Sequence, residues 1–134
     1  MESENKEVQN FGMPWVKEYG YAQAVKLGRT IWISGQLGHD EKGVLPVGME
    51  AQMKQTYVNI NKILAGYGFT SENVVEEVIY ALDSNAAFAA RKKLGREFYG
   101  INTEVARTLV GVVSLVIPNE VVEIKVVARK QRDI

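Results

Sequence analysis

The chain has 134 residues, with 16 basic and 16 acidic side chains, one histidine and no cysteine. One domain of this length buries roughly 68% of its unfolded surface without a disulfide, and these residue types exclude cysteine-based and histidine-rich metal centres. The balanced charge offers nucleic acid no basic field, the polar start has no signal-peptide character, and no run approaches about 18 apolar residues. We therefore expect a cytoplasmic protein that binds neither nucleic acid nor a membrane.

The two ends of the chain set the expected domain boundaries. Residues 1–12 are mostly polar and predict a frayed N-terminal extension. Residues 13–130 contain all the predicted helices and strands and form one domain. Residues 131–134 are a short C-terminal tail.

The domain begins with a predicted β-hairpin and a loop. Residues 21–27 and 30–36 are rich in β-branched and other apolar side chains, which predicts two strands. Gly28-Arg29 between them suits a tight turn. Residues 38–48 contain three glycines and Pro46, which indicate a loop.

Two helices are predicted from apolar side chains that recur three and four residues apart. Residues 49–67 form the first helix, which glycines end. Residues 74–82 predict a strand, and Asp83 or Ser84 can then cap the second helix. The apolar face of that helix carries Ala87, Ala90, Leu94 and Phe98. Its other face, which we expect to be solvated, carries Arg91, Lys92, Lys93, Arg96 and Glu97.

The last part of the chain predicts two more strands and completes the fold class. An apolar run over residues 105–113 and an alternating segment over residues 121–128 are separated by the turn Pro118-Asn119. The element order favours an α+β fold, with a mixed sheet and both helices on one of its faces. The other face would expose Trp32 and Val110. Because large exposed apolar patches mark interfaces, we expect a homo-oligomer that covers this face.

Arg107 lies alone in the apolar, β-branched run 105–113, which predicts a buried strand. A guanidinium out of water is costly unless a charge pairs with it. Either a carboxylate of the protein or a ligand would neutralise it, and its planar donors suit carboxylate and phosphate. A structural salt bridge and a solvated edge position remain open as alternatives.

Glu123 is the second candidate residue. If the strand over residues 121–128 pairs antiparallel with the Arg107 strand across Pro118-Asn119, Glu123 comes near Arg107. The alternative is that Glu123 and Lys125 are solvent-facing charges on a half-exposed strand.

The dipeptide Ser34-Gly35 ends the second predicted strand and is a third feature. Glycine after an apolar strand often indicates close approach of the backbone to a ligand. Many strands end in Ser-Gly, so the dipeptide is also compatible with an ordinary strand end.

An ordered set of segments resembles the RidA/YjgF family over about residues 21–128. No single segment is specific, but together they follow the family pattern. The first are Tyr21-Ala22-Gln23-Ala24-Val25 with Gly28, Ile33-Ser34-Gly35-Gln36, and Asn59 with Leu64-Ala65-Gly66-Tyr67-Gly68. The others are Val74-Val75 with Asp83, Ala106-Arg107-Thr108 with Val112, and Val122-Glu123-Ile124 with Ala128.

The resemblance implies a chorismate-mutase-like subunit assembled as a homotrimer, with three sites in the clefts between subunits. It implies hydrolysis of reactive 2-enamino or 2-imino acids, such as 2-aminoacrylate, to 2-keto acids and ammonia, with no metal or organic cofactor. Arg107 matches the arginine that binds the substrate carboxylate, and Glu123 matches the glutamate that positions the attacking water. Tyr21 matches a tyrosine that lines the site, and Ser34-Gly35 matches the backbone segment that approaches the substrate.

Departures from the family pattern leave alternatives open. Val105 replaces a proline that commonly precedes Ala-Arg, and Lys125 replaces a second acidic residue. The substrate can therefore be a larger enamine such as 2-aminomuconate, with Trp15 and His39 as candidate pocket-wall residues. A non-catalytic module that binds a small carboxylate or a protein is a further alternative. An RNA-directed activity, described for some family members, is disfavoured by the balanced charge.

Overall fold

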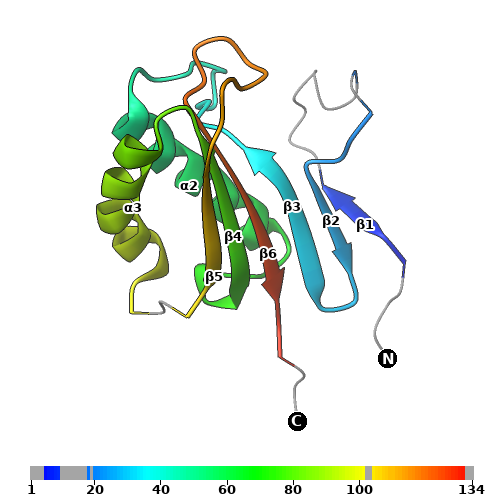
Figure 1. The fold of residues 1–134 in the computed structure, drawn as a ribbon. Coiled ribbons are helices and arrows are strands. Elements are labelled where there is room, and N and C mark those ends of the chain that lie inside the picture. The colour runs from blue at the N-terminus through cyan, green and yellow to red at the C-terminus, as the bar shows by residue number, and fades with distance from the viewer. Residues whose placement is uncertain (1–4, 10–17, 19, 102–103, 132–134) are drawn as a thin grey trace.

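In the computed structural model, residues 5–9, 18, 20–101 and 104–131 are described. They form a six-stranded mixed sheet in the order β1-β2-β3-β6-β4-β5, with two helices on one face (Figure 1). This arrangement confirms the predicted α+β class and the predicted placement of the helices. The strands are β1 (Glu7–Gln9), β2 (Ala24–Leu27), β3 (Thr30–Gln36), β4 (Val74–Ala81), β5 (Ala106–Gly111) and β6 (Val122–Arg129). The helices are α2 (Met49–Gly66) and α3 (Ser84–Tyr99), with a short 3-10 turn at Ser71–Asn73.

The predicted hairpin is confirmed, although β2 starts at Ala24 rather than Tyr21. Leu27 pairs with Thr30, so the turn consists of Gly28-Arg29 as expected. Gly28 has a φ of 61°, a left-handed conformation that glycine adopts without steric cost.

Part of the N-terminal extension is held on the sheet. Glu7–Gln9 form β1, which pairs antiparallel with β2. The Nζ of Lys26 lies 3.0 Å from Oε2 of Glu7, and the hydroxyl of Tyr67 donates to the Glu7 carbonyl at 2.8 Å. The expectation of a frayed extension is therefore wrong for these residues, because backbone pairing and side-chain contacts fix them.

The last strand, β6, lies in the middle of the sheet rather than beside β5. It runs antiparallel to both β3 and β4, whereas β4 and β5 are parallel. A parallel pair needs a crossover connection, which α3 supplies between β4 and β5. The predicted pairing of the Arg107 strand with the Glu123 strand is therefore wrong, because β4 lies between them.

The Arg107 strand, β5, is an edge strand, and most of its side chains are exposed in the single chain, Arg107 included. The prediction of a buried strand is therefore wrong for this chain by itself, because β5 pairs with β4 alone in the described sheet. On the face without helices Trp32 is 46% exposed, and Val110 is exposed as well. The homo-oligomer that would cover this face stays a prediction.

The hydrophobic core lies between the sheet and the two helices. As the helical spacing predicted, α2 buries Met53, Tyr57, Ile60 and Leu64, and the inner face of β6 buries Val122, Ile124, Val126 and Ala128. Each large aliphatic side chain removed from water contributes about 1.5–3 kcal/mol. Asp83 caps α3 as predicted, since its carboxylate accepts the N–H of Ala86 at 3.0 Å.

One carboxylate, that of Glu77 on β4, is fully buried inside this core. Its Oε2 accepts the hydroxyls of Tyr57 at 2.8 Å and Tyr99 at 2.5 Å. Its Oε1 accepts Nε–H of Arg91 at 2.7 Å, and a side chain on Gly95 would collide with that guanidinium. Burial and the Glu77 charge raise the pKa of both tyrosines, so their hydroxyls stay protonated and donate. The expectation that Arg91 lies on a solvated face is therefore wrong, because it pairs with Glu77.

We predict that Glu77→Ala lowers the free energy of unfolding by about 3–5 kcal/mol, because it leaves the Arg91 guanidinium without its counter-charge. Denaturant titration followed by circular dichroism measures the change. Glu76→Ala is the matched control, since Glu76 is the preceding residue of β4 and is exposed. It should change the same free energy by less than about 0.5 kcal/mol. Equal losses for the two variants would contradict the role of Glu77.

Candidate functional site

Glu123 lies on the open face of the sheet, against the backbone of β3. Its side chain points away from the helices, since its neighbours Val122 and Ile124 are fully buried on the helix face. A Cβ atom on Gly35 would collide with Oε2 of Glu123. The carboxylate therefore occupies the space that a side chain at position 35 would need, and a glycine is required there.

Two hydrogen bonds join this end of β3 to the segment that follows Tyr21. The hydroxyl of Ser34 donates to the Ala22 carbonyl at 2.7 Å, and its backbone N–H donates to the Gln23 carbonyl at 3.0 Å. Tyr21 is exposed beside these contacts. The structure thus brings the Tyr21 segment, Ser34-Gly35 and Glu123 to one region of the sheet.

Two buried glutamines, which belong to the family-like segments but were given no role there, hold the Ser34 backbone. Nε2 of Gln23 donates to Oε1 of Gln36 at 3.0 Å, and Nε2 of Gln36 donates to the Ser34 carbonyl at 2.8 Å. Buried amide networks of this kind restrict the orientation of their members. In the sequence, this role of Gln36 is indicated by its position directly after Gly35.

A second carboxyl group, that of Glu120, lies beside Glu123. Glu120 directly follows the turn at Pro118-Asn119 and is only 2% exposed. Its Oε1 accepts the N–H of Ile117 at 3.3 Å, whereas its buried Oε2 has no hydrogen-bond partner among the described residues. Burial raises the pKa of Glu120 to about 8, and the neighbouring Glu123 acts in the same direction.

Gln52 of α2 fixes the backbone on both sides of Glu120. Its Nε2 donates to the Asn119 carbonyl and its Oε1 accepts the N–H of Val121, both at 2.9 Å. One side chain, itself buried, therefore fixes the peptide groups on both sides of Glu120. Asn119 has a φ of 70°, a left-handed conformation that asparagine tolerates better than most residues.

Arg107 lies on the opposite face from Glu123. It pairs in register with Glu77, whose side chain is buried on the helix face, whereas Glu123 pairs with Tyr80 on the open face. Within the described residues no acidic side chain forms an ion pair with Arg107, since Arg91 occupies the Glu77 carboxylate. One chain therefore does not bring Arg107 and Glu123 together, and it leaves Arg107 accessible at the sheet edge.

Of the two candidate pocket-wall residues, Trp15 lies outside the described residues. His39 lies in the loop after β3, where Nδ2 of Asn59 donates to its carbonyl at 2.8 Å. Burial lowers the pKa of the imidazole, and the Asp40 charge opposes that effect. His39 is thus a neutral group at neutral pH.

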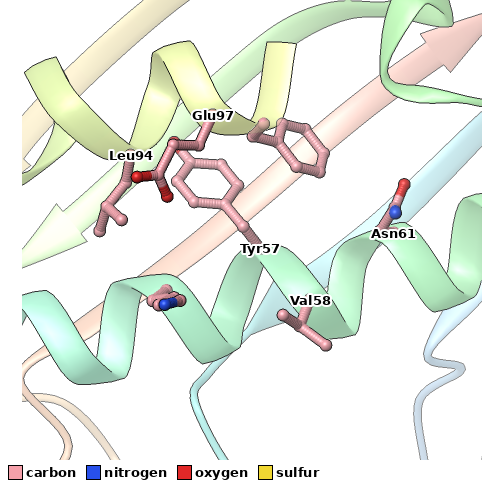
Figure 2. Close-up of a pocket in the computed structure, with 7 residues that line it drawn as sticks. Tyr57, Val58, Asn61, Leu94 and Glu97 are labelled. Carbon is pink, nitrogen blue, oxygen red and sulfur yellow. The ribbon is translucent and has the colours of Figure 1, made fainter. Parts of the chain in front are cut away.

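A groove of about 200 Å³ lies between α2 and α3 (Figure 2). Tyr57, Val58 and Asn61 line it from α2, and Leu94 and Glu97 line it from α3. None of the predicted site residues is among those that line this groove. We assign it no role in the chemistry.

The described part of the chain lacks two kinds of feature. Histidine, aspartate and glutamate side chains do not gather there in groups of three or more that could hold a metal ion. No described helix combines the length and the apolar character that crossing a membrane requires.

Comparison with known proteins places the chain in a family. The family model described as Endoribonuclease L-PSP matches residues 16–130. A RutC family protein of Aquifex aeolicus is 35% identical over 111 residues, which is 82% of this chain and 88% of the relative. The chain therefore belongs to the RidA/YjgF family, as its sequence segments indicated.

Solved structures and named enzymes add detail. A RidA from an Antarctic Psychrobacter species has a TM-score of 0.77 at 34% identity and covers 83% of this chain and 89% of its own. A YjgF-family protein of Mycobacterium tuberculosis has a TM-score of 0.81 at 23% identity, with 94% and 100% covered, which is a likeness in fold. A Capra hircus protein named 2-iminobutanoate/2-iminopropanoate deaminase is 37% identical over 81 residues, or 59% of this chain and 58% of the goat protein.

The raised pKa of Glu120 predicts that stability falls as the pH rises. The pKa increases from its ordinary 4.5 in the unfolded chain to about 8 in the folded chain, so between these values the unfolded chain releases a proton that the folded chain keeps. The stabilising effect of that proton is complete below about pH 4.5 and is lost as the pH rises through about 8.

Glu120→Gln should remove this dependence and be more stable than the wild type at pH 8 by at least about 1 kcal/mol. Urea titrations between pH 5 and about pH 8 test it, with the exposed Glu97→Gln as control. Parallel pH profiles for wild type and Glu120→Gln would contradict the raised pKa.

Proposed function

We propose that this chain hydrolyses small 2-enamino or 2-imino acids to 2-keto acids and ammonia. The observation that carries the proposal is the Glu123 carboxylate, seated on the Gly35 backbone at the open face of the sheet. The names of relatives support it, since mammalian proteins 37–42% identical over about half the chain are named 2-iminobutanoate/2-iminopropanoate deaminases.

Hydrolysis of a 2-imino acid depends more on the positioning of the substrate and the water than on a strong acid or base. A 2-imino acid has an electrophilic C=N carbon next to a carboxylate. Arg107 binds that carboxylate through two N–H groups, and each hydrogen bond to a charged group contributes about 1.5–3 kcal/mol. Glu123 orients a water molecule and accepts its proton as the water attacks the carbon.

A complete site of this kind takes residues from two copies of the chain. Arg107 and Glu123 lie on opposite faces of one sheet, so Arg107 of one copy has to meet Glu123 of another. The accessible Arg107 edge and the exposed Trp32 on the open face favour such an assembly. We take the assembly to be the homotrimer that the family resemblance implies.

Arg107→Ala should lower kcat/KM at least about 100-fold, because the substrate carboxylate loses two charged hydrogen bonds. The assay follows 2-aminoacrylate that a serine dehydratase releases, with loss of enamine absorbance as the readout. Arg96→Ala, an exposed arginine of α3, is the control and should keep full activity. Full activity in Arg107→Ala would contradict its role, whereas ligand-induced stabilisation without turnover would favour a binding module instead.

Mixing two inactive variants tests whether the site spans two copies. If Arg107→Ala and Glu123→Gln chains are co-refolded in equal amounts, random assembly leaves both residues intact in about one quarter of the shared sites. The mixture should therefore regain about one quarter of the wild-type activity. A site within one chain predicts no recovery, and that result would contradict the two-copy arrangement.

A further inference from the structure

Arg91 of α3 has hydrogen-bond donors that its contacts in the core do not use. Its Nε–H donates to Oε1 of Glu77 at 2.7 Å, and its Cζ lies 5.1 Å from the centre of the Tyr99 ring. A guanidinium also carries N–H groups on both Nη atoms. In Arg91 these groups donate no hydrogen bond to the residues that the structure describes, although only 12% of the side chain is exposed. They are therefore available to a ligand.

The unused end of the Arg91 side chain lies over Gly95. A Cβ atom at position 95 would collide with Nη1 of Arg91, so a glycine is required there. Residues four apart in an α-helix lie on the same face, one turn from each other. The Nη groups of Arg91 thus extend along α3 toward its C-terminal end.

Arg107 lies at the same level as these Nη groups. At the other end of α3, a side chain on Gly111 would touch Ser84, and α3 runs antiparallel to β5 because it is the crossover between two parallel strands (Figure 1). From this contact Arg107 lies about 13 Å back along β5, at about 3.3 Å per residue. Arg91 and Gly95 lie roughly 10 and 16 Å along α3, at about 1.5 Å per residue.

Arg107 also lies on the face of the sheet that the helices cover. It pairs with Glu77 in the parallel register of β4 and β5, and side chains paired in this way share a face. Glu77 is the residue that Arg91 contacts, so one guanidinium is bound to this carboxylate and the other lies on the neighbouring strand. The exposed Arg107 has no ion-pair partner among the described residues.

The charges of these three side chains suit a single carboxylate. Arg91 and Arg107 are positive and Glu77 is negative, which leaves one net positive charge. A carboxylate has about four lone-pair sites. When Arg107 binds it through two parallel hydrogen bonds, it can still accept N–H groups from a second guanidinium.

We propose that Arg91 is a second arginine of the substrate site, and that its Nη groups bind the same substrate carboxylate as Arg107. The proposal rests on the proposed deaminase function, in which this carboxylate belongs to a 2-enamino or 2-imino acid. Glu77 is a positioning residue, since it holds Nε of Arg91. Two arginines of one copy fix the plane of the carboxylate, and the C=N carbon is then oriented toward the water.

Nitrogen NMR of the wild type labelled at its arginine side chains tests the shared carboxylate without a substitution. Pyruvate is the probe, because it is the 2-keto acid that 2-aminoacrylate gives. Two guanidinium signals should shift together as pyruvate is added. One should be absent from the spectrum of Arg91→Lys and the other from that of Arg107→Lys. A shift of the Arg107 signal alone, or of neither signal, would overturn the proposal.

Arg91→Lys separates substrate binding from the structural role of Arg91. Lysine keeps a positive charge beside Glu77 but lacks the planar fork of N–H groups. The Kd of pyruvate should rise at least about 10-fold, and kcat/KM for 2-aminoacrylate released by a dehydratase should fall at least about 10-fold. A structural role alone predicts that neither changes. Arg96→Lys, at an exposed arginine of the same helix, is the control and should leave both values unchanged.

The outcomes separate this inference from the proposed function. Circular dichroism checks that Arg91→Lys is folded, and if it is not, the number of guanidinium signals that shift in the wild type decides. A folded Arg91→Lys with wild-type affinity and kcat/KM overturns the role of Arg91 and leaves the deaminase function intact. A wild type without turnover overturns the deaminase function, whereas the NMR titration still decides whether Arg91 and Arg107 bind one carboxylate.

Discussion

The buried carboxylate of Glu77 determines both how the helices meet the sheet and what charge remains at the sheet edge. It accepts hydrogen bonds from Tyr57 of α2 and from Arg91 and Tyr99 of α3, so one side chain of β4 joins both helices to the sheet. Arg91 neutralises the Glu77 carboxylate. Arg107, which pairs with Glu77 in the register of β4 and β5, therefore has no ion-pair partner among the described residues. The contact that completes the core therefore leaves an accessible guanidinium at the edge, the group best suited to bind a carboxylate.

Local patterns predicted the element types, because helix spacing, the Asp83 cap and the Gly28-Arg29 turn act over a few residues. Strand order could not be predicted in the same way. The alternation in β6 shows which face each side chain takes but not which strands flank it, and the turn at Pro118-Asn119 suggested a hairpin with β5. The α3 crossover instead places β5 parallel to β4, which leaves the other edge of β4 to β6. Arg91 was misjudged for a related reason, since its partner Glu77 lies on a different element.

The site could be predicted in part. Gly35 after an apolar strand indicated a close approach, and the group that makes this approach is the Glu123 carboxylate. Glu123 was a candidate on two grounds: an expected pairing with the Arg107 strand, which is wrong, and the family resemblance. The alternation of β6 alone did not single it out, because an exposed charge on such a strand is ordinary. Nothing in the sequence singled out Glu120, because a glutamate after a turn is expected in solvent. The backbone around it is fixed by Gln52, which is distant in the sequence. Nor could one sequence show that Arg107 and Glu123 lie on opposite faces, since that depends on strand order.

The charges of the proposed site also affect how well it binds an anionic substrate. A 2-enamino acid brings one negative charge, and Glu120 and Glu123, if both were ionised, would add two more against the single positive charge of Arg107. Unit charges about 4 Å apart interact by about 4 kcal/mol at the effective dielectric near a protein surface, so each uncompensated charge weakens substrate binding appreciably. Burial keeps the Glu120 carboxyl protonated below its raised pKa of about 8, which removes one of these repulsions and favours binding of the substrate carboxylate.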